Sequence, residues 1–297
     1  MADRDSPAEL CFAVAPEADG WALRDFLRAA GVSATLVKAV KKQGGFWVGD
    51  TPLRTCDVVR AGQSVRFYLP PEPPTSVQPQ AIPLAIAYES RHVLVLEKPA
   101  GMAVHPTLNY HSGTLANAYM GLLQARGEAG VFRPVNRIDK DTSGLVLCAK
   151  NAWAAALLAG SARKVYRAIL EGEPSPEQGR IEAPIARAPG SIILRRVWPG
   201  GKPSCTEYAA ERRAGEYTLV RAAPITGRTH QLRVHFAHIG CPLAGDELYG
   251  GSRAGIARQA LHCAEISFAE PGSTERKTVT SPLPPDMAAL LESVKER

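Results

Sequence analysis

The sequence predicts an α+β fold in two parts, a small N-terminal unit and a larger part built on a mixed sheet. In the larger part, strand-like runs outnumber helical segments and do not alternate strictly with them, which disfavours a parallel doubly wound fold. Prolines crowd residues 70–83 and separate the two parts. The 297 residues are enough for two domains and a sizeable core.

The N-terminal unit is predicted to hold two helices followed by two strands. Apolar residues recur at helical spacing over residues 23–30 and again after Ser33, whose hydroxyl can cap the second helix. Strands are expected at residues 46–48 and 65–69, with a Gly49-Asp50 turn after the first.

This unit is also basic. Residues 20–66 hold eight basic and three acidic side chains, a net charge of +5 out of +6 for the whole chain. Lys38, Lys41 and Lys42 fall on one face of the second predicted helix. A polyanionic partner is the economical explanation, and a solvated helix face is the alternative.

The proline-rich stretch predicts a semi-rigid extended spacer outside any core, with few contacts across it. The expected domains are therefore residues 1–69, with a core at about 19–69, a linker at 70–83, and a second domain at 84–297. The strands expected beyond the linker are residues 93–97, 145–149, 165–171, 192–197, 206–210, 217–222 and 266–268, and the helices are residues 115–125, 153–159, 231–239 and 287–294.

A polar turn before a buried strand holds the first chemical motif. Residues 135–150 read Val-Asn-Arg-Ile-Asp-Lys-Asp-Thr-Ser-Gly-Leu-Val-Leu-Cys-Ala-Lys, so Arg137 and Asp139 stand just ahead of an apolar run. A carboxylate in such a turn can be held rigidly at the edge of a sheet. The alternative is that Asp139 and Asp141 only cap the turn.

A second motif lies in residues 226–240, Thr-Gly-Arg-Thr-His-Gln-Leu-Arg-Val-His-Phe-Ala-His-Ile-Gly. Its apolar spacing predicts a short helix that Thr229 can cap and Gly240 can end. His230 and Arg233 are then one turn apart on one face. A cation there could pair with a distant carboxylate, whereas the alternative is a solvated helix face.

The two blocks resemble the catalytic motifs of the RluA-type pseudouridine synthases. Asn136 and Ile138 depart from the usual His and Leu of the first motif. Further blocks follow in the family's order and extend the resemblance over residues 82–291; they are residues 85–89, 96–101, 104–106, 164–166, 202–204, 206–208 and 261–262. The resemblance implies a mixed, largely antiparallel sheet with the active site in a central cleft.

The resemblance also implies a reaction, the isomerisation of uridine to pseudouridine in RNA, which requires no cofactor. Asp139 would be the carboxylate that acts at the sugar, as carboxylates do in glycoside chemistry. Arg233 would pair with Asp139 and keep this carboxylate ionised, because a nearby opposite charge lowers the pKa of a carboxyl group. Tyr166 would stack on the target base and relay a proton, although core packing is the ordinary role of such a tyrosine.

RNA contacts are expected from both domains. Arg137 matches an arginine that approaches the stack where the target nucleotide flips out, and a phosphate contact or structural ion pair is the alternative. Residues 19–69 resemble the RNA-binding domain of ribosomal protein S-four, apart from Trp21-Ala22-Leu23 in place of Arg-Leu-Asp. The alternative is a small domain that only packs on the larger one. The expected RNA-binding residues are Arg137, Lys38, Lys41, Lys42, Arg228 and His230.

Large-subunit ribosomal RNA is the favoured substrate, and transfer RNA is the alternative. Two other functions stay open at this stage, a non-catalytic RNA-binding or ribosome-assembly factor, and a magnesium nuclease that uses Asp139, Asp141, Asp246 and Glu247.

The rest of the sequence sets the expected cell compartment. Six cysteines without paired spacing predict reduced thiols, and no histidine cluster has a recognised zinc spacing. No signal peptide or apolar run long enough to span a bilayer is apparent. We expect a cytoplasmic monomer with no metal and no membrane contact.

Overall fold

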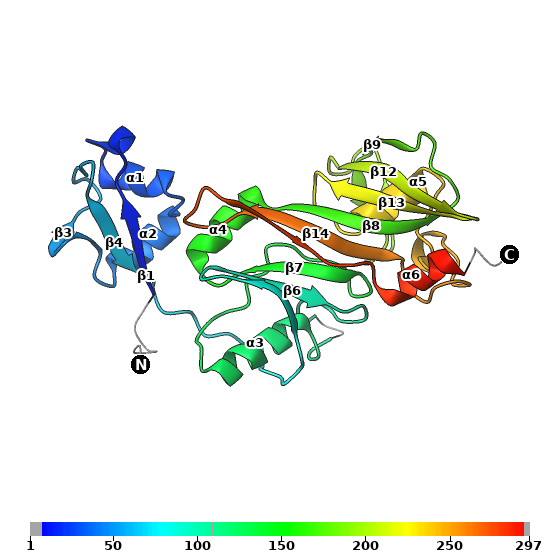
Figure 1. Cartoon of the computed structure of the whole chain (residues 1–297), viewed down its shortest axis with the longest axis horizontal. Helices are drawn as coiled ribbons and strands as arrows, with labels where there is room; N and C mark the ends of the chain where they lie inside the picture. Colours follow the sequence, from blue (N-terminus) through cyan, green and yellow to red (C-terminus); the bar gives the residue numbers. More distant parts are fainter. Residues whose placement is uncertain (1–7, 108–109, 294–297) are drawn as a thin grey trace.

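The computed structural model describes residues 8–107 and 110–293 and places the two parts of the chain along its long axis (Figure 1). The N-terminal unit is a four-stranded antiparallel sheet, in the order β1-β4-β2-β3, with two helices packed on it. Its elements are β1 (Glu9–Ala13), η1 (Pro16–Ala18), α1 (Leu23–Ala29), α2 (Ala34–Lys41), β2 (Phe46–Val48), β3 (Thr51–Leu53) and β4 (Ser64–Tyr68).

Local chemistry explains these elements. Leu23, Phe26 and Leu27 form the buried face of α1. The Ser33 hydroxyl accepts a hydrogen bond from the Leu36 amide at 3.2 Å and so caps α2, as the sequence predicts. Gly49 has a positive φ of 55° in the tight turn between β2 and β3. Strands β1 and β3 were not predicted, because each is short and gains its stability from pairing with a neighbour.

The larger part is built on nine strands. Their bounds are β5 (Ala85–Glu89), β6 (Val93–Lys98), β7 (Ser143–Ala149), β8 (Arg163–Glu171), β9 (Gln178–Glu182), β12 (Cys205–Ala214), β13 (Tyr217–Pro224), β14 (Leu261–Ala269) and β15 (Arg276–Thr280). The order is β5-β6-β7-β14-β8-β13-β12-β9, and β15 pairs with β14. Only the β7–β14 pair is parallel among the described strands, so the prediction of a mixed, largely antiparallel sheet is confirmed.

Four helices accompany this sheet: α3 (Leu115–Arg126), α4 (Ala152–Ser161), α5 (Gln231–His238) and α6 (Pro285–Glu292). A capping box between Thr114 and Asn117 starts α3, and Gly127 ends it with φ 65°. Leu115, Tyr119 and Leu123 belong to the core that also holds the buried residues of β6 and β7. Truncating one such leucine to alanine costs about 2–5 kcal/mol.

Three sequence predictions need correction. The strand expected at 192–197 begins only at Arg195 in β11 (Arg195–Val197), because the residues before it form the loop of a hairpin with β10 (Ile185–Arg187). Thr229 does not cap α5; His230 occupies that position and no side chain caps it. The last predicted helix ends at Glu292, and residue 294 lies outside the described residues.

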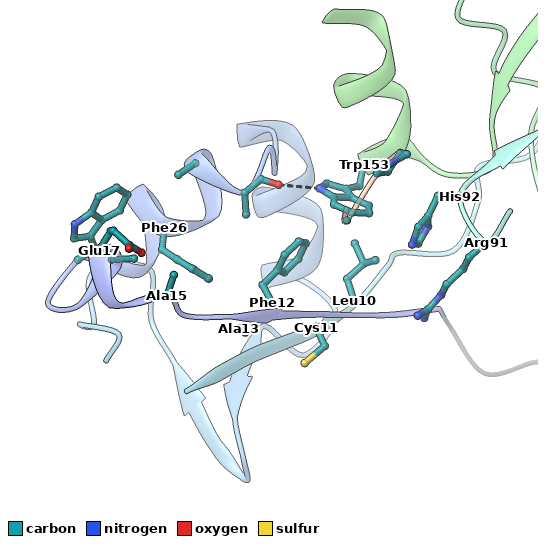
Figure 2. Close-up of a pocket in the computed structure, with 16 residues that line it drawn as sticks. Leu10, Cys11, Phe12, Ala13, Ala15, Glu17, Phe26, Arg91, His92 and Trp153 are labelled. Carbon is teal, nitrogen blue, oxygen red and sulfur yellow. Dashed lines mark hydrogen bonds between the residues drawn. The ribbon is translucent and has the colours of Figure 1, made fainter. Parts of the chain in front are cut away.

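The junction between the two parts has more contacts than the proline-rich spacer predicts. Trp153 of α4 is buried among N-terminal residues, and its indole N–H donates to the Ala30 carbonyl at 3.0 Å (Figure 2). Its ring meets Phe12 edge-on at 5.3 Å between centroids. Gly31 lies so close to Leu157 that an added Cβ would come within 2.4 Å of a methyl group. A cavity of about 550 Å³ lies beside this contact, and Asp139 is not among the residues that line it.

Part of the expected linker is packed against the larger domain. The Asn117 amide donates to the Gln78 carbonyl at 2.8 Å, and the Gln80 amide donates to the Asn117 carbonyl at 3.0 Å. Glu72 forms an ion pair with Arg133. The proline-rich stretch is therefore an extended segment that packs along the surface of the larger domain and is not a solvated linker over its whole length.

Candidate active site

Asp139 lies in the turn that leads into β7, at the edge of the large sheet. All seven residues of β7 are buried, so the strand is a rigid support for this turn. The Thr142 amide donates to the Asp139 carbonyl at 3.1 Å. The Asp139 side chain stays 28% exposed, which leaves its carboxylate open to a substrate.

Lys98 holds the same turn from beneath. This buried ammonium group donates to the carbonyls of Pro99, Met102 and Lys140 at 2.7–2.8 Å. Burial lowers the pKa of Lys98 to about 7, although the nearby charges of Asp141 and Asp139 oppose the shift. Because Lys140 follows Asp139 directly, this contact fixes the backbone next to the carboxylate. The sequence offered only the Lys98-Pro99 block as a signal for it.

Arg233 joins two carboxylates that are far apart in the sequence. It donates to Asp246 through two nitrogens, each at 2.7 Å, and to Asp139 through a third at 3.3 Å. Burial favours a neutral guanidinium, but the hydrogen bonds and charge of Asp246, with the charge of Asp139, raise the pKa of Arg233. The expected contact with Asp139 is present, and sequence reasoning missed that Asp246 is the stronger partner.

His230 approaches Asp139 from the start of α5. Its φ of 57° is the only positive value for a non-glycine residue in the described chain, so this backbone is strained. The Tyr249 hydroxyl accepts from the Arg195 amide at 3.1 Å and lies 2.7 Å from His230 Nδ1. Burial lowers the pKa of His230. A neutral imidazole that accepts from Tyr249 carries its proton on Nε2, 3.9 Å from Asp139.

Tyr166 lies on β8, paired with Cys263 of β14 and Ala222 of β13. Burial raises the pKa of Tyr166 well above its ordinary value, and the charges of Cys263 and Asp139 add to this effect. The hydroxyl is therefore protonated at neutral pH and near enough to Asp139 to feel its charge. This position can serve either the core or a substrate base, since Tyr166 is also part of the main hydrophobic core.

The predicted RNA-binding residues lie in different places. Arg137 is exposed next to Asp139, and Arg228 is exposed with its side chain on the Pro203 carbonyl at 3.2 Å. The three N-terminal lysines are exposed on α2 or directly after it, far along the molecule from the catalytic turn. Only Arg137, Arg228 and His230 thus belong to the surroundings of the two motifs.

The two departures from the family motif have structural roles here. The Asn136 amide oxygen accepts from the Leu147 amide at 2.8 Å, and its nitrogen donates to the Leu145 carbonyl at 3.2 Å. Ile138 is buried in the main core. Both side chains point away from solvent and brace the turn that carries Asp139.

The carboxylates of the nuclease hypothesis do not form a ligand set. Both oxygens of Asp246 accept from Arg233, and Glu247 pairs with Arg253 at 3.3 Å. Within residues 8–107 and 110–293, no three His, Cys, Asp or Glu side chains gather in a metal-binding arrangement. In the same residues no helix has the length and apolar character needed to cross a membrane.

This geometry fits a carboxylate that reacts with a sugar. An accessible carboxylate held by an arginine can stabilise or trap an electron-poor carbon, and a protonated tyrosine nearby can exchange a proton. The positions of both groups are set by buried strands.

Several known proteins resemble this chain in sequence. The sequence pattern of the RNA pseudouridylate synthase family matches residues 92–238. An uncharacterized RNA pseudouridine synthase of Bacillus subtilis, YjbO, is 34% identical over 277 residues, which cover 91% of this chain and 98% of that protein. The ribosomal large subunit pseudouridine synthase D of Xanthomonas campestris is 36% identical, with 86% and 82% covered.

Solved structures show the same fold. Human RNA pseudouridylate synthase domain containing 4 aligns with a TM-score of 0.58 at 22% identity, over 71% of this chain and 92% of that one. Human RNA pseudouridylate synthase domain containing 1 aligns with a TM-score of 0.54 at 29% identity, over 71% and 86%.

Proposed function

We propose that this chain, which belongs to the RNA pseudouridylate synthase family, modifies uridines of large-subunit ribosomal RNA with Asp139 as its catalytic carboxylate. The chain is an RNA pseudouridine synthase, an isomerase. The substrate and the residue roles are the proposed part. The observation that supports the residue roles is the group formed by Asp139, Arg233 and Asp246 at the edge of the sheet.

In the proposed mechanism, Asp139 acts at the ribose of a flipped-out uridine. The bond from N1 to C1′ breaks, a bond from C5 to C1′ forms, and the proton lost from C5 is balanced by one gained at N1. Arg233 holds the Asp139 carboxylate in position through its hydrogen bond at 3.3 Å. We assign to Tyr166, whose pKa burial raises further above neutral, contact with the base and relay of the C5 proton.

The choice of ribosomal RNA draws on two observations. Relatives from Xanthomonas campestris and Xylella fastidiosa, both 36% identical, are ribosomal large subunit pseudouridine synthases D. The basic N-terminal unit adds a second surface for a large polyanion, which we propose is an RNA-binding domain of the type in ribosomal protein S-four. Its lysines 38, 41 and 42 are exposed and form no ion pair within the described residues.

The test of Asp139 is the substitution Asp139→Asn, which keeps shape and removes charge. We expect pseudouridine formation to fall to the detection limit while RNA affinity stays within about twofold, because one carboxylate contributes chemistry rather than phosphate contacts. Near-normal turnover would remove Asp139 from the mechanism.

The test of the substrate is a map of pseudouridines in total RNA from cells with and without the gene. Loss of sites in large-subunit ribosomal RNA is expected. Loss only in transfer RNA would overturn the ribosomal assignment and leave the isomerase activity intact.

A further inference from the structure

The hairpin of β10 and β11 exposes large apolar side chains beside the active site. Ile192 is 79% exposed, Ile193 56% and Trp198 48%. All three fall within seven residues, whereas such side chains are usually buried. A cluster of exposed apolar side chains of this kind indicates an interaction surface.

The charge of the hairpin indicates what it binds. Residues 183–206 contain no Asp or Glu but hold Arg187, Arg195, Arg196 and Lys202. None of these four cations forms an ion pair with a described carboxylate, although many other arginines of the chain do. The positive charge is therefore free for a polyanion.

The exposed tryptophan is held in place rather than loose. The Arg196 guanidinium lies over the Trp198 ring at 4.0 Å from the centroid, and Arg196 Nε is buried with no hydrogen-bond partner among the described residues. The Trp198 amide donates to the Pro184 carbonyl at 2.8 Å. Arg195 NH1 donates to the carbonyls of the loop, with the shortest bond to Ile193 at 2.8 Å. The surface is preorganised, so little conformational entropy is lost when a ligand binds.

The two strands of the hairpin lie unusually close together at its base. Gly201 lies against Ile185, where an added Cβ would come within 2.6 Å of a backbone carbon. The Ile185 and Lys202 backbones exchange hydrogen bonds at 2.9 and 3.0 Å across the same point. Only glycine fits there without moving the hairpin.

The hairpin is also connected to the catalytic group. The Arg195 amide donates to Tyr249, and Tyr249 is bonded to His230, which faces Asp139 at 3.9 Å. Strand β11 packs against α5, the helix that carries Arg233. The hairpin therefore contacts the elements that hold His230 and Arg233 around Asp139.

We propose that the hairpin over residues 185–202 is a stacking platform for an unpaired RNA base that neighbours the target uridine. An arginine-backed indole offers a flat surface to any base, and the surrounding cations contact the phosphates. The preferred substrate is then a uridine in a loop or bulge rather than in an uninterrupted duplex. This inference rests on the RNA substrate of the proposed function, but not on the role of Asp139.

The experiment measures binding of the full-length enzyme to two synthetic RNAs of equal charge, a stem with an unpaired uridine loop and a fully paired duplex. Trp198→Ala should weaken binding of the loop RNA about tenfold, which is about 1.4 kcal/mol, and leave duplex binding within about twofold. Trp198→Phe should lose less, because it keeps an aromatic face. The slope of binding against salt should not change, since no charge is removed.

The matched control is Ile86→Ser, which removes an exposed isoleucine, 37% exposed, from β5 and should alter binding of neither RNA. Ile192→Ser is a second variant on the platform and should also weaken loop binding selectively. Unchanged affinity of both platform variants for the loop RNA would overturn the proposal and favour a protein partner. Equal losses for loop and duplex would overturn it as well, because stacking on a free base would not be involved.

Discussion

Replacing Arg233 should destabilise the protein as well as inactivate it. Asp246 is buried, and Arg233 supplies both of its short hydrogen bonds. Arg233→Ala leaves this carboxylate in a low-dielectric site without a partner. The substitution also removes the only guanidinium that contacts the Asp139 carboxylate among the described residues.

The structure gives the size of both effects. Breaking a buried ion pair on one side costs about 3–5 kcal/mol of unfolding free energy. In a domain of this size that corresponds to a fall in Tm of roughly 6–20 °C. Loss of a preorganised charge at the reacting group lowers turnover by about 10²–10³.

The assay combines thermal unfolding with single-turnover pseudouridine formation for three variants. Arg233→Lys keeps a charge near Asp246 but loses the paired geometry, so it should recover part of the Tm and little of the turnover. The double change Arg233→Met with Asp246→Leu removes both charges and should recover most of the Tm, because a buried pair can be exchanged for apolar groups at little cost. It should remain inactive.

Two results would refute this reasoning. An Arg233→Ala protein with unchanged Tm and turnover would show that the pairing has no energetic role. A double variant that regains both stability and turnover would show that Asp139 acts without the arginine. RNA affinity serves as the control measurement and should change little, because Arg233 is buried.

Four other predictions follow from the structure. Removal of residues 1–70 keeps the packed segment at Gln78 and Gln80 and should leave a folded domain. That domain should aggregate, because Trp153 and Leu157 become exposed, and light scattering measures this aggregation. The change Trp153→Gln in the shortened chain should reduce the light scattering. The same deletion should lower the salt slope of RNA binding by about 2–3 if each of the three lysines neutralises one phosphate, and an unchanged slope would exclude them from the interface. Lys98→Met should lower the free energy of unfolding by roughly 1–3 kcal/mol for each carbonyl left unpaired, which denaturation measures. It should also lower turnover more than RNA affinity, which single-turnover rates and binding measure. Retained turnover would show that Lys98 does not position the catalytic turn. Finally, burial lowers the pKa of His262 to about 4. Between pH 6.5 and 4 this histidine is therefore protonated in the unfolded chain but neutral in the folded chain. Its contribution to the free energy of unfolding is complete above pH 6.5 and is lost as the pH drops toward 4. The difference between the pKa values of His262 in the unfolded and folded chains corresponds to roughly 3 kcal/mol of unfolding free energy. His262→Asn should flatten this part of the curve of unfolding free energy against pH.

Local patterns in the sequence were sufficient for the helices and the buried strands of the core. Ser33 caps α2 through its own side chain, and the apolar run at 145–147 forms the buried strand β7. These features depend on residues close together in the chain, and so their spacing predicts them. The two motifs likewise identified Asp139 and Arg233, which the fold brings into contact across 94 positions.

Only the tertiary structure decided how those groups are held. Asp246 and Tyr249 become partners of Arg233 and His230 because the turn after α5 folds back onto the helix, and nothing in local spacing reports that return. His230 keeps a strained backbone because these long-range contacts hold it, so a rule based on helix caps chose Thr229 instead.

The junction at Trp153 gives the same lesson at the level of domains. The apolar clusters do not divide at residues 70–83, since Trp153 belongs to the N-terminal cluster and Val77 packs on the larger core. Proline content describes only the stiffness of that stretch. It carries no information on whether the two units touch, because that depends on which surfaces meet once each has folded. The sequence thus predicted the helices, most of the buried strands and the two motifs, whereas long-range packing decided which side chains Arg233 and His230 meet and how the N-terminal unit docks.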